Sequence, residues 1–289
     1  PDDWHVHLRD DPVLRDTVKD ISRYFGRAIV MPNLATPVTN VEMASQYRRR
    51  ILAHLADDSA FEPMMTLYLT DRTTTETVKQ AGQSGLIRAF KFYPAGATTN
   101  ADAGVQKMES IYPLFEEMTL QRIPLLIHGE VADPGVDVFD REAVFIDRHL
   151  DHLVKSFPEL KIVFEHISTA GAVQFMQSSP ANVAATIAVH HLLYNRNHLL
   201  ADGMKSLYYC MPILKERADQ QALIKAATSG SSKYFLGSDS APHAQSAKED
   251  CSGCAAGAYT AHAAIELYAE VFDEAGALDK LEGFASHFG

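Results

Sequence analysis

Short apolar runs followed by longer stretches of helical periodicity recur eight times along the 289 residues, and this alternation constrains the fold most strongly. The runs predict strands at 4–8, 27–31, 64–69, 87–93, 124–128, 161–166, 183–189 and 234–238. The helices are expected at 12–24, 41–55, 74–84, 107–121, 140–157, 169–176, 219–229 and 259–274. Eight strand–helix units predict an α/β fold, a (β/α)8 barrel, as a single domain over residues 1–289. The alternative is an open doubly wound sheet, but no G-x-G-x-x-G motif or P-loop follows any expected strand.

Composition excludes several classes of protein. The net charge is −11 and there is no basic tract, so we expect no nucleic-acid partner. No apolar run approaches the roughly 20 residues of a membrane span, and the first residues lack the pattern of a signal peptide. Three cysteines are too few for a disulfide scaffold, so we expect a reducing, cytoplasmic location.

Polar side chains close most of the expected strands. They are His5 and His7, Asn33, Lys91, His128, His166, His191 and Asp239. In (β/α)8 barrels the C-terminal ends of the strands carry the chemistry, and structural histidines have no reason to prefer that position on strand after strand. The pattern predicts a cluster of these side chains at one rim of the barrel.

The residue types at this rim favour a metal site. His5 and His7 alternate along a strand, so both imidazoles point to the same side and can share one ion. A single histidine is more often a hydrogen-bonded core residue, and Asp239 alone is more often a turn or cap residue. Together with His128 and His166, these side chains fit a first-row metal held by nitrogen and oxygen.

Lys91 is unusual within an apolar strand. Alternation places it opposite Phe90 and Phe92, so it points into the barrel if those rings pack against the helices. A lysine at a strand end usually extends to solvent instead. Among histidines and a cation, however, an amine loses its proton readily and can add carbon dioxide. The resulting carbamate is an anionic ligand able to bridge two metals.

Several other residues have a weaker sequence signal. Arg9, Asn33 and His243 together form a possible clamp for a carboxylate. The single C-x-x-C of Cys251 and Cys254 lacks the four ligands of a closed zinc site, so we interpret it as a loop feature. The adjacent His190 and His191 are consistent with packing or hydrogen bonding.

Six segments, in order, resemble the short bacterial dihydroorotases of the amidohydrolase superfamily. They are WHVHLRD (4–10), MPNL (31–34), KFYPA (91–95), LIHGE (126–130), FEH (164–166) and GSDSAPH (237–243). An H-x-H motif indicates only the superfamily, whereas K-x-Y-P-A with D-S-A-P-H narrows the resemblance to dihydroorotase. The resemblance implies reversible cyclisation of N-carbamoyl-L-aspartate to L-dihydroorotate in pyrimidine synthesis, by an enzyme that is commonly a homodimer.

The resemblance also implies a binuclear site of two Zn²⁺ ions. The residues matched to its ligands are His5, His7 and Asp239 for the more buried ion, His128 and His166 for the second, and N6-carboxylated Lys91 as the bridge. Asp239 would also carry the proton between water and the ring nitrogen. The residues matched to substrate contacts are Arg9, Asn33 and His243 for the carboxylate, the backbone at Met211 and Ala255 for the ring, and Thr98 and Thr99 at the tip of a closing loop.

The chain departs from the family pattern in two places. It has Ala188 and Val189 where the family usually has Thr-Pro, and the family sequence continues beyond the last residue here, so we expect a segment shorter at the C-terminus. Two alternatives remain open. One is another cyclic-amide hydrolase, such as a hydantoinase or allantoinase. The other is a catalytically inactive scaffold for aspartate transcarbamoylase, although such chains typically lose metal ligands and all six candidates are present here.

Overall fold

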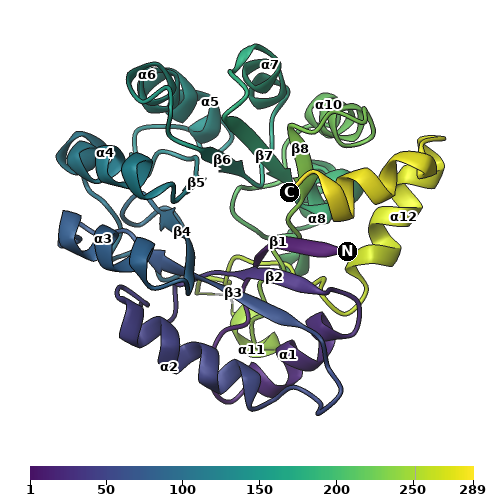
Figure 1. The fold of residues 1–289 in the computed structure, drawn as a ribbon. Coiled ribbons are helices and arrows are strands. Elements are labelled where there is room, and N and C mark those ends of the chain that lie inside the picture. The colour runs from purple at the N-terminus through teal and green to yellow at the C-terminus, as the bar shows by residue number, and fades with distance from the viewer. Residues whose placement is uncertain (251) are drawn as a thin grey trace.

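Eight parallel strands pair in chain order and form the centre of the molecule (Figure 1). The structure is a computed structural model that describes residues 1–250 and 252–289. The strands are β1 Asp2–Val6, β2 Arg27–Val30, β3 Glu62–Tyr68, β4 Ile87–Phe92, β5 Leu125–His128, β6 Ile162–Glu165, β7 Val183–Ile187 and β8 Tyr234–Leu236. Each is buried on both faces, as expected for parallel strands covered by helices.

The sheet closes on itself where β8 meets β1. The backbone N–H of His7 donates to Ser240 O (3.0 Å) and that of Asp239 donates to His5 O (2.9 Å). The buried Asp3 carboxylate reinforces this seam, because its Oδ1 accepts from the backbone N–H of His5 (3.1 Å) and of Ser238 (2.9 Å). The (β/α)8 barrel predicted from the sequence is therefore confirmed.

Helices surround the barrel on its outside (Figure 1). The longer ones are α1 Leu14–Ser22, α2 Val41–Leu52, α3 Thr75–Gln83, α4 Tyr112–Gln121, α7 Ala170–Ser178, α10 Arg217–Ala227 and α12 Ala264–Glu274. Shorter helical segments are α5 Arg141–Phe145, α6 Asp151–Ser156, α8 Val189–Leu193, α9 Arg196–Leu200, α11 Gln245–Lys248, and η1 to η5 at Met108–Ile111, Ile146–Leu150, Ser206–Tyr208, Leu278–Lys280 and Gly283–His287. None of the helices in the described ranges is both long and apolar enough to cross a membrane.

Side-chain caps mark the starts of several helices. Asn40 accepts from the N–H of Met43 at the start of α2, and Thr169 accepts from that of Ala172 at the start of α7. These caps satisfy donors that the first helical turn leaves free. The two helices therefore begin within one residue of the starts expected at 41 and 169.

Two predicted boundaries are wrong, and one predicted helix is interrupted. The strand expected at 183–189 ends at Ile187, since the chain turns into α8 and places His191 in a helix rather than at a strand end. The helix expected at 259–274 begins only at Ala264, because the preceding residues run beside Ser240. The helix expected at 140–157 contains a π-helical turn at Ile146–Leu150.

The alternation along β4 separates core from site. Phe90 and Phe92 pack into the large apolar core between sheet and helices. Lys91, between them, is fully buried and lies on the opposite side, inside the barrel. This is the arrangement that the strand periodicity predicts.

Candidate active site

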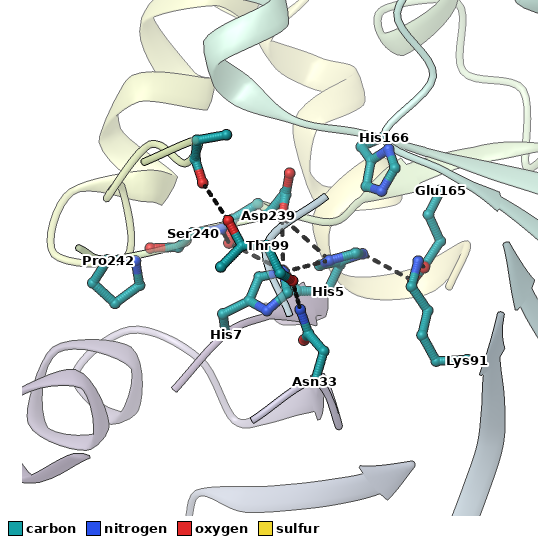
Figure 2. Close-up of polar contacts among 12 residues, drawn as sticks. His5, His7, Asn33, Lys91, Thr99, Glu165, His166, Asp239, Ser240 and Pro242 are labelled. Carbon is teal, nitrogen blue, oxygen red and sulfur yellow. Dashed lines mark hydrogen bonds and ion pairs between the residues drawn. The ribbon is translucent and has the colours of Figure 1, made fainter. Parts of the chain in front are cut away.

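The C-terminal ends of the strands surround a small cavity that contains most of the predicted site residues. Its lining is His5, His7, Arg9, Asn33, Tyr93, Thr98, Thr99, His128, His166, Met211, Asp239, Ala241, Ala256 and Gly257. Figure 2 shows His5 at the centre of the polar contacts, with His7 and Asp239 on one side and Glu165 and Lys91 on the other. The cavity therefore lies at the end of the barrel that carries the active site in (β/α)8 enzymes.

Three ligand-type atoms form a triangle at the seam between β1 and β8. His5 Nε2 lies 3.2 Å from His7 Nε2 and 3.2 Å from Asp239 Oδ1, and His7 Nε2 lies 3.1 Å from the same oxygen. Ligand atoms around a tetrahedral zinc, each about 2.0 Å from the ion, are separated by roughly 3.3 Å. The donor types and their spacing fit a metal ion.

The electrostatics of this triangle favour a bound cation. Burial alone lowers the pKa of His5, but Glu165 and Asp239 outweigh it and raise that pKa to about 9. Burial lowers the pKa of His7 to about 3, so His5 carries the positive charge of the pair and His7 is neutral at pH 7. The carboxyl of Asp239 stays ionised, because the effects of His5 and His7 outweigh burial and hold its pKa well below the usual range. A metal ion would replace the proton on His5.

A second group of ligand-type atoms lies beside the first. His5, Glu165 and His166 are all buried with nitrogen or oxygen atoms close together, and the rings of His5 and His166 are 5.1 Å apart. His166 Nδ1 is buried and finds no hydrogen-bond partner within residues 1–250 and 252–289. The ring of His128 lies 4.8 Å from that of His166. These imidazoles face the same cavity as the triangle.

Lys91 lies beneath this second group. Its Nζ is in contact with Glu165 Oε2 and lies 4.5 Å from the centre of the Tyr93 ring. Burial lowers the pKa of Lys91, although the nearby Glu165 carboxylate opposes that effect. Glu165 also lies 2.9 Å from His5 Nδ1 through its other oxygen. The Glu165 carboxylate thus connects Lys91 to the three ligand-type atoms of His5, His7 and Asp239.

His128 has a carboxylate partner of its own. Its Nε2 lies 3.0 Å from Glu130 Oε2, and the other Glu130 oxygen lies 3.8 Å from Lys215 Nζ. All three side chains are almost fully buried. A carboxylate on one imidazole nitrogen fixes the orientation of the ring and leaves the other nitrogen for a ligand.

The backbone is strained at three of the predicted residues. Arg9, His166 and Asp239 have φ of 61°, 41° and 47°, in the left-handed region. Such a conformation costs a non-glycine residue about 1–3 kcal/mol and is common at functional sites. Neighbouring contacts hold it: the N–H of His166 donates to Thr186 Oγ1 (2.7 Å), and Gly237 lets β8 approach that side chain, where a Cβ would lie only 2.7 Å from Thr186 Cβ.

Of the expected carboxylate clamp, Arg9 and Asn33 line the cavity, and His243 lies next to it against Arg9. Arg9 Nη2 lies 3.0 Å from His243 Nε2, and Arg9 Nε donates to Pro242 O (3.2 Å). Burial, together with the Arg9 guanidinium, lowers the pKa of His243 to about 4, so its ring is neutral at pH 7. Asn33 Nδ2 donates to Thr99 O (3.1 Å), which brings the expected loop tip over the cavity. Arg9 is therefore the cationic member of the clamp.

Of the two residues expected to contact the substrate ring, Met211 and Ala255, only one lies at the cavity. Met211 lines the cavity, whereas Ala255 is absent from its lining and its neighbours Ala256 and Gly257 take that place. The N–H of Ala255 donates to Ala247 O (2.9 Å), and its carbonyl accepts from Lys248. Of the C-x-x-C pair, Cys251 lies outside the described residues, and Cys254 is a free thiol.

A further buried cluster joins His190, His191 and Cys210. His191 Nε2 and Cys210 Sγ both lie close to Pro212 O, at 2.9 and 3.2 Å. The sequence left packing and hydrogen bonding open for the histidine pair, and His191 makes such a hydrogen bond. Both residues support the chain next to Met211.

Sequence reasoning missed the two acidic partners, Glu165 and Glu130. Glu165 precedes the predicted ligand His166 by one residue, and Glu130 follows the predicted ligand His128 by two. Both are buried near the end of an apolar run. A carboxylate in such a position requires a cationic or donating partner. That signal was present in the sequence, but the identity of the partner depends on which strands become neighbours.

Comparisons with known proteins agree with this geometry. The family model described as "Amidohydrolase family" matches residues 3–285. Dihydroorotases of Shewanella denitrificans and Pseudomonas syringae pv. tomato are each 60% identical to this chain over all 289 residues, which cover 84% and 83% of their lengths.

Solved structures give the same result. A dihydroorotase from Saccharomyces cerevisiae in complex with 5-fluoroorotic acid is 34% identical (TM-score 0.92), and one from Campylobacter jejuni is 36% identical (TM-score 0.91). Both alignments cover all of this chain, and they cover 82% of the Saccharomyces cerevisiae chain and 81% of the Campylobacter jejuni chain. An L-hydantoinase from Arthrobacter aurescens, at 16% identity and a TM-score of 0.80, shares the fold. The chain belongs to the dihydroorotase family of the amidohydrolases, hydrolases that act on cyclic amides.

Proposed function

We propose that this chain interconverts N-carbamoyl-L-aspartate and L-dihydroorotate with a binuclear zinc site bridged by N6-carboxylated Lys91. The observation that carries the proposal is the approach of His5 Nε2, His7 Nε2 and Asp239 Oδ1 to within 3.2 Å of one another, at the same rim as Arg9. A cluster of metal-type donors beside a fixed guanidinium suits a substrate with a reacting carbonyl and a separate carboxylate.

In this proposal His5, His7 and Asp239 hold the first zinc, and His128 and His166 hold the second. The ions would supply Lewis acidity for the reacting carbonyl and a lowered pKa for water. The support is the spacing of the first three donors and the unpartnered, buried Nδ1 of His166 in the described part of the chain. Glu130 orients His128.

Lys91 would join the two ions as a carbamate. Its neutral Nζ forms a bond to the carbon of carbon dioxide and releases a proton, which leaves an anionic group with two oxygens. The support is burial, which lowers the pKa of Lys91 and so raises the share of neutral amine. Once the lysine is anionic, Glu165 loses its contact with a cationic amine and keeps its interaction with His5 (2.9 Å).

Asp239 moves the proton. In ring opening its carboxylate accepts a proton from the attacking water and passes it to the departing amide nitrogen, while a C–O bond forms and the C–N bond breaks. Ring closure follows the same path in reverse. The support is the ionised state of Asp239 and its contacts with both His5 and His7.

The remaining residues bind and enclose the substrate. Arg9, with Asn33 and His243, would hold the carboxylate, since a guanidinium forms two parallel hydrogen bonds with such a group. Met211 is proposed as a backbone contact to the ring, with Ala256 in the place expected for Ala255. Thr98 and Thr99 would close over it and exclude water, which is consistent with their place in the cavity lining.

The cellular setting is also part of the proposal. The reaction would serve pyrimidine synthesis in the cytoplasm, and the enzyme would act as a homodimer. The support for the compartment is the small number of cysteines. Size-exclusion chromatography with light scattering tests the dimer, and a monomer at micromolar concentration would contradict it.

The substrate assignment is tested by assaying the zinc-loaded protein, with bicarbonate present, against L-dihydroorotate, N-carbamoyl-L-aspartate, hydantoin and allantoin. We expect turnover of the first two compounds and none of the last two. Turnover of hydantoin or allantoin alone would identify another cyclic-amide hydrolase. An inactive protein with substoichiometric zinc would indicate the scaffold alternative.

A further inference from the structure

Two backbone segments from different connections form one wall of the cavity. Met211 lies between η3 and α10, and Ala256 and Gly257 lie between α11 and α12. Neither segment belongs to a helix or strand. Loops without regular structure move unless other contacts hold them, so the shape of this wall depends on side chains that tie the segments down.

One buried ammonium group contacts both segments. Lys248 Nζ donates to Tyr209 O (2.8 Å), Ala255 O (3.0 Å) and Gly257 O (2.9 Å). An ammonium has three donors, so these carbonyls satisfy it completely. The side chain is only 5% exposed, and no carboxylate of the described residues lies within 4.0 Å of its Nζ. The three carbonyls are thus what stabilises the buried charge.

The contacts also determine which carbonyl faces the cavity. The carbonyls of Ala255 and Gly257 face Lys248, whereas that of Ala256 faces away from it, 2.9 Å from His243 Nε2 and 3.4 Å from Thr99 Oγ1. Lys248 therefore sets the orientation of a group that contacts both the carboxylate clamp and the loop tip.

One backbone hydrogen bond also joins the segments directly. The N–H of Gly257 donates to Tyr209 O (3.0 Å), the same carbonyl that accepts from Lys248. Glycine is required at this position, since its φ is 153° and a Cβ would lie 2.5 Å from Ala241 O. Lys248 and this backbone hydrogen bond together join the two segments into one wall.

We propose that Lys248 is a positioning residue for substrate binding: it clamps residues 209 and 255–257 so that the backbone at Met211 and Ala256 faces the substrate. This inference rests on the proposed function. The metal-type residues come from β1, β4, β5, β6 and the end of β8, none of which Lys248 contacts through its ammonium. Loss of the clamp should therefore weaken substrate binding and leave the zinc content unchanged.

Lys233 supplies a matched control. Its Nζ also donates to several backbone carbonyls, at Met176 (3.0 Å), Ser179 and Pro180 (3.2 Å). It precedes β8, at the end of the barrel opposite the cavity. Lys233→Met removes a comparable lysine clamp without touching the site.

The experiment compares wild type, Lys248→Met, Lys248→Arg and Lys233→Met in steady-state turnover of L-dihydroorotate, with zinc measured in each. We expect Lys248→Met to raise KM at least tenfold with kcat changed less than threefold, Lys248→Arg to recover part of the loss, and Lys233→Met to keep the wild-type KM. An active wild type with an unchanged KM in Lys248→Met would overturn the inference, as would equal increases in Lys248→Met and Lys233→Met.

Hydrogen exchange compared among wild type, Lys248→Met and Lys248→Arg tests the clamp without relying on turnover. The Ala255 and Gly257 amides donate to Ala247 O and Tyr209 O, and we expect both to exchange at least tenfold faster in Lys248→Met than in wild type, with Lys248→Arg in between. Equal exchange in the three proteins would overturn the inference. A wild type that turns over neither dihydroorotate nor carbamoyl aspartate would instead refute the proposed function, and the exchange result would still decide whether the clamp exists.

Discussion

The two sides of the candidate site are organised to different degrees. On the β1–β8 side, His5, His7 and Asp239 place three donor atoms within 3.2 Å of one another. On the β5–β6 side, the rings of His128 and His166 are 4.8 Å apart, as close as the 5.1 Å between the rings of His5 and His7, but no hydrogen-bond-length contact joins their nitrogens and Nε2 of His128 is directed at Glu130. Only the first side forms a compact set of ligands from these side chains alone.

The difference follows from how each side is built. His5 and Asp239 are joined through the backbone hydrogen bond that closes the barrel, so closure itself assembles the first set. His128 and His166 lie at the ends of neighbouring strands with no such short contact between them. Their proposed metal depends on a bridge from Lys91, which requires a chemical modification. We infer that the first ion binds more tightly and the second depends on the carbamate.

The largest expected effect is that of Asp239→Ala, which removes a ligand and the proposed proton carrier of the compact side. Loss of general acid–base catalysis typically costs 10²–10⁴-fold, and we expect kcat to fall by at least about 10³-fold. Substrate binding should stay measurable, since Arg9 is untouched. Turnover by the variant within tenfold of wild type would exclude Asp239 as the proton carrier.

Lys91→Ala tests the bridge. We expect loss of the second zinc and a fall in activity of at least about 100-fold, because the carboxylate that remains beside these histidines, that of Glu165, is held against His5 Nδ1 (2.9 Å) and does not replace the bridge. Lys91→Arg is the matched variant, since it keeps a cation beside Glu165 but forms no carbamate. Metal analysis and turnover assays of both variants decide whether Lys91 acts as a carbamate. An active Lys91→Arg enzyme with two zincs would show that the lysine acts only as a cation.

Glu130→Gln perturbs the less compact side alone. The amide keeps the shape of the side chain but holds His128 less firmly, and partners of this kind change metal affinity by 10–100-fold. We expect about tenfold weaker binding of the second zinc and unchanged binding of the first, measured by titration with a chelator. Equal weakening of both ions would mean that the two sides are not independent.

The smallest effect concerns the metal-free protein. The pKa of folded His5, about 9, lies above its ordinary value of 6.5, so its protonation stabilises the fold. That stabilisation is fully present below pH 6.5 and is lost as the pH rises through 9. The Tm difference between chelated wild type and chelated His5→Gln should therefore shrink between pH 6.5 and 9. A difference that is constant or grows over this range would contradict the assigned pKa.

Much of the fold could be predicted from the sequence because it depends on local patterns. Phe90 and Phe92 flank Lys91 with the period of a strand, and Asn40 and Thr169 cap helices that begin where the sequence suggests. The end of β7 could not be predicted, because Val189 is equally compatible with a strand and with the first turn of α8. The late start of α12 depends on contacts of the preceding loop with Ser240, which no local pattern reveals.

For the site, the sequence predicts which residues take part, but not which side chains contact one another. His5 and His7 could be singled out because they alternate along the first expected strand, and Asp239 because it follows an apolar run. That Glu165 contacts both Lys91 and His5 depends on β1, β4 and β6 facing one interior, which appears only when the barrel closes. The role of Lys248 depends on three carbonyls from two loops and has no sequence pattern.

The central claim is that separate strands bring two cations together at one rim of the barrel. Its most direct test is a crystal structure of the zinc-loaded protein with anomalous data collected across the zinc edge. The account predicts two anomalous peaks, one among His5, His7 and Asp239 and one beside His128 and His166, with density extending from Lys91 Nζ to both. A single peak, or zinc located away from these side chains, would contradict it.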